Sequence, residues 1–74
     1  MPMPSRFPAR AHKAARKAIE RAGTTETWAV FKELYRMARF SKMRTPEGHM
    51  KDIWKIETTR DAMDLIKEVS EVAD

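Results

Sequence analysis

Apolar side chains recur at helical spacing between residues 28 and 38, and this stripe constrains the fold more than any other feature of the sequence. At 100° per residue the stripe covers about half of a helix circumference, and charged residues fill the other side. An apolar arc of that width is typical of a central helix that packs against two neighbours. We therefore predict a helix over residues 25–40, with Thr24 or Thr25 as its cap. The members of the stripe are Trp28, Val30, Phe31, Leu34, Tyr35, Met37 and Ala38.

Residues 8–22 and 59–73 show the same helical period. Pro8 suits the first turn of the earlier segment, and Gly23 can close it in a left-handed conformation. Thr58 and Asp61 resemble a capping box at the start of the later segment. The apolar face of residues 8–22 is nearly all alanine, whereas residues 59–73 present Ala62, Met63, Leu65, Ile66, Val69, Val72 and Ala73.

Residues 46–57 allow two interpretations. Thr45, Pro46 and Glu47 provide a capping hydroxyl, a first-turn proline and an acid near the positive helix end, which favours a helix that begins near Pro46. The alternative is a short hairpin around residues 41–58, because Trp, Ile and Thr favour strands.

The chain has only 74 residues and no cysteine, so one domain must be stabilised without disulfides. We predict a small all-α domain of three to four helices over residues 8–74, preceded by an extended arm over residues 1–7. The α+β fold with the hairpin is the alternative. Pro2, Pro4 and Pro8 disfavour helix in the arm. In the core we expect Trp28, Phe31, Leu34 and Leu65 to be mostly buried.

Charge is distributed unevenly along the chain. Residues 1–44 carry eleven basic and three acidic side chains, while residues 45–74 carry four basic and eight acidic ones; the whole chain is +4. Such asymmetry indicates a binding surface, because the basic half projects a field of one sign. The alternative is that the two halves pair with each other, and a row of acids on residues 59–73 could neutralise the basic row on residues 8–22. The same charges could also pair between two chains, which would make a homo-oligomer.

The basic row of the first predicted helix is the main candidate site. Nucleic-acid phosphates, or the acidic protein surface of a larger machine, would bind there. A helix-turn-helix pattern placed on Gly23 fails at half of its positions, so phosphate contact without base reading is favoured. We therefore predict a non-enzymatic binding or regulatory protein. The candidate binding residues are Arg10, Lys13, Arg16, Lys17 and Arg21.

A second candidate surface lies on the predicted central helix. Leu34-Tyr35-Arg36, followed by Arg39 and Phe40, resembles the signature of the LYR-motif proteins. That family consists of small three-helix mitochondrial adaptors that commonly bind an acylated acyl carrier protein. The resemblance covers about seven residues, and the family's later Phe-Arg element has no counterpart here. It implies a structural adaptor or assembly subunit with Tyr35, Arg36, Arg39 and Phe40 as its protein-partner contact.

Catalytic and metal-binding motifs are nearly absent. His12 and His49 are the only histidines, and neither belongs to a set of three metal ligands. The only glycines are Gly23 and Gly48, so the sequence contains no glycine-rich phosphate loop. We expect no enzymatic activity, no cofactor and no metal.

No run of about 18 apolar residues or signal-peptide core is present, so we expect no membrane insertion and an intracellular, cytoplasmic location. A mitochondrial location is the alternative, because the stretch before Glu20 is rich in Arg, Lys and Ala and holds no acid.

Overall fold

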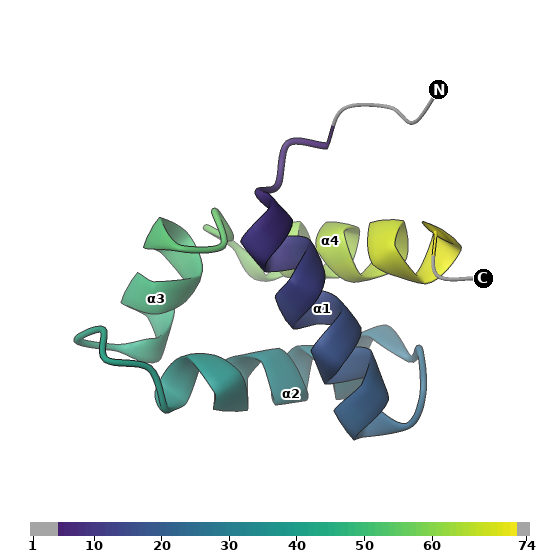
Figure 1. Cartoon of the computed structure of the whole chain (residues 1–74), viewed down its shortest axis with the longest axis horizontal. Coiled ribbons are helices and arrows are strands. Elements are labelled where there is room, and N and C mark those ends of the chain that lie inside the picture. Colours follow the sequence, from purple (N-terminus) through teal and green to yellow (C-terminus); the bar gives the residue numbers. More distant parts are fainter. Residues whose placement is uncertain (1–4, 73–74) are drawn as a thin grey trace.

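The computed structural model describes residues 5–72 and places four helices in them. No strand occurs in this range, so the all-α prediction is confirmed and the hairpin alternative around residues 41–58 is wrong. Figure 1 shows α1 running diagonally across α2 and α4, while α3 packs against α2 near one end of the molecule. The helices are α1 (Ala9–Ala22), α2 (Thr27–Arg39), α3 (Pro46–Asp52) and α4 (Thr59–Val72).

The ends of α1, α3 and α4 include the local signals of the sequence, but the predicted cap of α2 is wrong: α2 begins at Thr27, and no side chain caps it, because the Thr24 hydroxyl accepts from the Glu26 N–H, which precedes the helix. Gly23 adopts a φ of 67°, and its N–H donates to the Ile19 carbonyl at 2.9 Å, which closes α1. The hydroxyl of Thr45 accepts from the Gly48 N–H at 2.9 Å at the start of α3. At the start of α4, the Asp61 N–H donates to the Thr58 hydroxyl at 3.1 Å, while the Asp61 carboxylate accepts from the Thr58 N–H.

Helix α3 is shorter than the predicted segment over residues 46–57. It ends at Asp52, and the chain then turns through Lys55, which has a φ of 59°. The Ile56 N–H donates to the Met50 carbonyl at 2.8 Å across this turn. The turn brings both Trp54 and Ile56 into the core, which a continued helix would not allow at that spacing.

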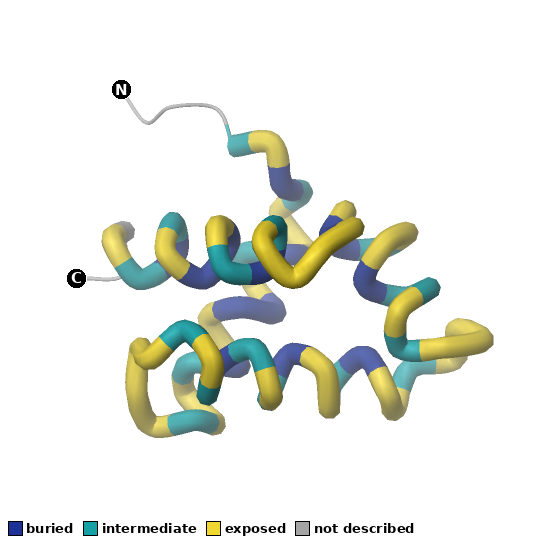
Figure 2. The backbone as a smooth tube through the Cα atoms, turned by 180° about the vertical axis from the view of Figure 1, so that it is seen from behind, coloured by how far each residue is buried: buried dark blue, intermediate teal, exposed yellow. Residues whose placement is uncertain are grey.

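One hydrophobic core joins all four helices, and Figure 2 shows its buried positions recurring along α1, α2 and α4, while α3 contributes Met50. The alanine face of α1 is buried, and its small side chains permit close approach of the neighbouring backbones. Leu34 and Leu65 are fully buried, as predicted. The core residues are Phe7, Ala11, Ala14, Ala15, Ala18, Val30, Leu34, Ala38, Met50, Trp54, Ile56, Ala62, Leu65, Ile66 and Val69.

The predicted burial of Trp28 is wrong, because this residue is 53% exposed, whereas Phe31 is partly buried and packs against the core. The reason is the width of the apolar stripe on α2. Val30, Leu34 and Ala38 lie four residues apart on the face that packs against the other helices. Trp28 lies more than 90° around the helix from the centre of that face, so it remains at the surface.

Residues 5–7 are not helical, yet they pack against the helices. Phe7 is buried in the core, and Ser5 and Arg6 contact α4. The remainder of the predicted arm, residues 1–4, lies outside the described residues, as do the side chains of Val72 and Ala73. Among the helices that the structure describes, none is both long enough and apolar enough to cross a membrane.

Candidate nucleic-acid interface

The five predicted cations of α1 lie together on its outer side. Burial of the alanine face against α2 and α4 turns the opposite side of α1 towards solvent, and all five side chains are exposed. From Arg10 to Arg21 the helix rises by about 16 Å. One acid, Glu20, is exposed on the same side. The members of this basic row are Arg10, Lys13, Arg16, Lys17 and Arg21.

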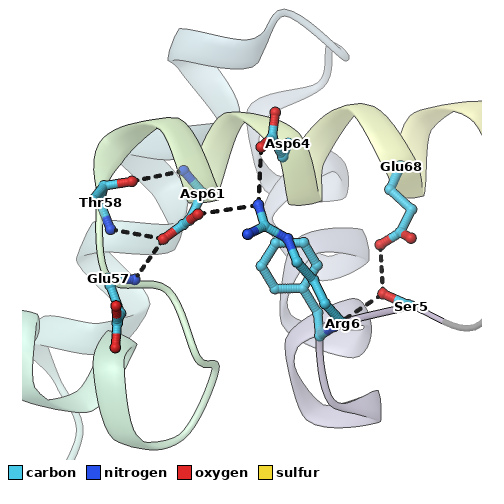
Figure 3. A network of polar contacts seen from close by, with 8 residues as sticks. Ser5, Arg6, Glu57, Thr58, Asp61, Asp64 and Glu68 are labelled. Atoms are coloured by element: carbon cyan, nitrogen blue, oxygen red, sulfur yellow. Dashed lines mark hydrogen bonds and ion pairs between the residues drawn. The ribbon is translucent and has the colours of Figure 1, made fainter.

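None of these five cations forms an ion pair with a residue in the range 5–72. Three of the four acids of α4 are bound by other groups, as Figure 3 shows for the two that contact Arg6. The Arg6 Nη2 atom lies 3.0 Å from the Asp61 carboxylate and 2.9 Å from that of Asp64. The His12 Nε2 atom lies 3.0 Å from the Glu68 carboxylate. Helices α1 and α4 do contact each other, but Asp61, Asp64 and Glu68 of α4 contact Arg6 and His12 rather than the basic row.

The Asp61 carboxylate also receives backbone hydrogen bonds. Desolvation alone would raise the pKa of Asp61, but the N–H groups of Glu57 and Thr58, together with the Arg6 charge, outweigh it and hold that pKa below its usual value. The carboxylate is therefore held in its charged form at the junction of the arm and α4.

Ser5, His12 and Glu68 meet at one point but do not form a catalytic relay. The Ser5 hydroxyl and the Glu68 carboxylate both lie 3.0 Å from the same His12 atom, Nε2. A nucleophile–base–acid relay uses the two ring nitrogens separately, with the acid on one and the nucleophile on the other. The Ser5 hydroxyl also donates to Glu68 at 2.8 Å, so this cluster links the arm to α4 by a hydrogen bond.

The structure brings together three of the four residues of the second predicted site. Tyr35, Arg36 and Arg39 line one shallow groove along the outer side of α2. Phe40 is 83% exposed at the end of α2, but it does not line this groove.

Three further residues of the groove were missed as site residues: Trp28, Phe31 and Lys32. The Trp28 and Phe31 rings are stacked, with centroids 5.5 Å apart and planes 21° from parallel. Spacings of three and four residues from Trp28 through Phe31 and Lys32 to Tyr35 could have shown that these residues share one side of the helix.

Two side chains that line the groove, Tyr35 and Arg36, contact neighbouring acids. The Tyr35 hydroxyl donates to Glu47 at 3.1 Å, and this hydrogen bond, with the charge of Glu47, raises the pKa of Tyr35. Arg36 lies 3.3 Å from the Glu33 carboxylate. Lys32 and Arg39 have no ion partner among the residues that the structure describes.

Across residues 5–72, no group of three or more His, Asp or Glu side chains is placed to hold a metal ion. No protein-family model, curated protein or solved structure matches the chain. The resemblance to the LYR-motif proteins therefore rests on residues 34–40 alone.

Proposed function

We propose that this chain is a non-enzymatic binding or regulatory protein that engages nucleic-acid phosphates through the basic row of α1. The observation that carries the proposal is the state of that row: five exposed cations with no ion partner among residues 5–72. Phosphate contacts made by such groups release condensed counterions, and this release drives binding without base recognition.

The chemistry of the exposed side of α1 favours phosphates over an acidic protein surface. Apart from the five cations, its exposed residues are Ala9 and Glu20, so the row contains no large apolar side chain. Protein interfaces usually draw their affinity from buried aromatic and apolar anchors. Nucleic-acid backbones bind to positive charge alone.

The salt dependence of binding to mixed-sequence duplex DNA tests this proposal. Five phosphate contacts predict a slope of log affinity against log salt of about −4 to −5. Replacing Lys13 and Lys17 together by Gln should reduce the magnitude of the slope by roughly 2 and weaken all sequences alike.

The matched control is the double replacement of Lys51 and Lys67 by Gln. Both lysines are exposed, and their loss changes the net charge equally, but they lie on α3 and α4. The control should retain nearly the full slope. Absence of binding at about 20 mM salt, or equal effects of the two double variants, would contradict the proposal.

An adaptor or assembly subunit is the second candidate, with Tyr35, Arg36, Arg39 and Phe40 as its contact surface. The observation in its favour is Phe40, a large aromatic side chain that is 83% exposed. The simplest partner is a second copy of the chain, which sedimentation at increasing protein concentration would detect. Phe40→Ala should then abolish the association, and a monomer at every concentration would exclude this homo-oligomer.

A further inference from the structure

We propose that the groove on α2 is a stacking platform for single-stranded nucleic acid, and that unpaired bases stack on Trp28. This inference rests on the proposed function, because it assumes that nucleic acid is the partner, and it names the form of nucleic acid that is bound. The residues of the platform are Trp28, Phe31, Lys32, Tyr35, Arg36 and Arg39.

The first observation is the exposure of an aromatic pair. Trp28 is stacked against Phe31, yet 53% of Trp28 remains open to solvent. Phe31 is half-buried and packs against the core, so it supports the Trp28 ring from the protein side. A ring held in this way can accept a further flat ring with little loss of side-chain entropy.

The second observation is the charge around the rings. Lys32, Arg36 and Arg39 line the same groove, and none of its lining residues is acidic. Two carboxylates contact groove residues: Glu33 pairs with Arg36, and Glu47 accepts from Tyr35. Glu47 and Glu57 line a separate pocket on the other side of Phe31 and Tyr35. Lys32 and Arg39 have no ion partner within residues 5–72 and are available for phosphates.

Aromatic rings interleaved with cations are the combination that single-stranded nucleic acids bind: the bases stack on the rings while the phosphates contact the cations. A duplex can place its phosphates against the cations, but its bases cannot stack on the rings, because they are already stacked within the double helix. The groove therefore predicts a preference for single strands that the basic row of α1 alone would not produce.

Two single-stranded probes, oligothymidylate and oligouridylate, together with a mixed-sequence DNA duplex, test the inference in the full chain at low salt. The chain contains two tryptophans, and Trp54 is buried. Quenching of tryptophan fluorescence by a stacked base should therefore come from Trp28. We expect both single strands to quench this emission, and the duplex to bind with little quenching.

The decisive variant is Trp28→Ala, with Phe40→Ala as its matched control. Both side chains are exposed aromatics of α2 or its end, but only Trp28 lines the groove. Trp28→Ala should weaken single-strand binding by roughly 5- to 150-fold and leave duplex binding nearly unchanged. Phe40→Ala should leave both unchanged, and circular dichroism would confirm that each variant is folded.

The outcomes separate this inference from the proposed function. Suppose that duplex and single strands bind with equal affinity, and that this binding depends on Lys13 and Lys17 but is unchanged by Trp28→Ala. That result would overturn the stacking platform, and the proposed role of the basic row would stand. Single-strand binding that depends on Trp28 but not on Lys13 and Lys17 would support the platform and overturn the role of the row. Failure of all three probes to bind would overturn both proposals, leaving the groove as a protein-contact surface.

Discussion

On α4, the carboxylates of Asp61, Asp64 and Glu68 each lie within about 3 Å of Arg6 or His12, whereas the five cations on the outer side of α1 have no ion partner in the described chain. Both surfaces are charged and lie on helices that contact each other. The difference arises from the arm: residues 5–7 cross to α4 and bring Arg6 to its acids. A short non-helical segment thus binds three of the four α4 acids that could have neutralised the basic row.

Phe7→Ala should produce the largest change, because Phe7 anchors the arm in the core. Truncation of a buried Phe costs about 3–5 kcal/mol, which is most of the stability expected at this size. Urea unfolding would measure the loss, and Leu34→Ala at a fully buried position, with an expected cost of about 2–5 kcal/mol, is the comparison. An unchanged unfolding midpoint for Phe7→Ala would show that the arm is not docked in solution.

Arg6→Gln should lower the melting temperature slightly, by roughly 2–5 °C, because exposed ion pairs contribute little and Arg6 contacts two acids. The double replacement of Lys13 and Lys17 by Gln should leave the melting temperature nearly unchanged, since these lysines have no ion partner in the described chain. A larger loss for the lysine variant would reverse the comparison and indicate internal pairing of the basic row.

The pH dependence of stability should report Asp61. Its pKa is lowered in the folded state, so its contribution is complete above the unfolded pKa of about 3.9 and is lost as the pH falls through the lower folded value. Melting temperatures measured downward from about pH 5 should fall less steeply in Asp61→Asn, whose side chain does not titrate. Parallel curves for the two proteins would show that Asp61 is not held by the arm and the backbone.

Glu20→Gln should produce the smallest effect. Glu20 is the one exposed acid on the outer side of α1, and its removal increases the positive field of the row. Duplex affinity should rise by at most about fivefold at low salt, which titrations would detect. Weaker binding by this variant would contradict the placement of the interface on this side of α1.

Much of the fold could be predicted from local signals. The bounds of α1 and α4 follow from apolar periodicity and from end signals such as Gly23 and Thr58, which act within one or two turns. Periodicity alone defines α2, which begins at Thr27 without the predicted threonine cap. The positions of Trp28 and Phe7 could not be predicted in this way. Contacts between segments far apart in the chain decide which half of the wide stripe on α2 packs inward. Such contacts also decide whether the proline-bounded arm packs against the helices.

The candidate site could be predicted in part for the same reason. The exposure of the basic row follows from its position opposite the alanine face, which the sequence of α1 alone defines. The ion pairs of the α4 acids could not be predicted from the sequence, because Arg6 and His12 contact α4 only in the folded structure. The sequence indicates the groove on α2 only at Tyr35, Arg36 and Arg39, because the apolar period places Trp28 and Phe31 in the core, and Phe31 does pack against it.

The most direct test of the central claim is an NMR titration that follows the side-chain ammonium signals of the lysines as duplex DNA is added. The account predicts that Lys13 and Lys17 shift together and saturate at the same DNA concentration, while Lys51 and Lys67 remain unchanged. Equal shifts at all four lysines would show contact without a defined surface. Unchanged signals at Lys13 and Lys17 would contradict the claim that the basic row of α1 binds phosphates.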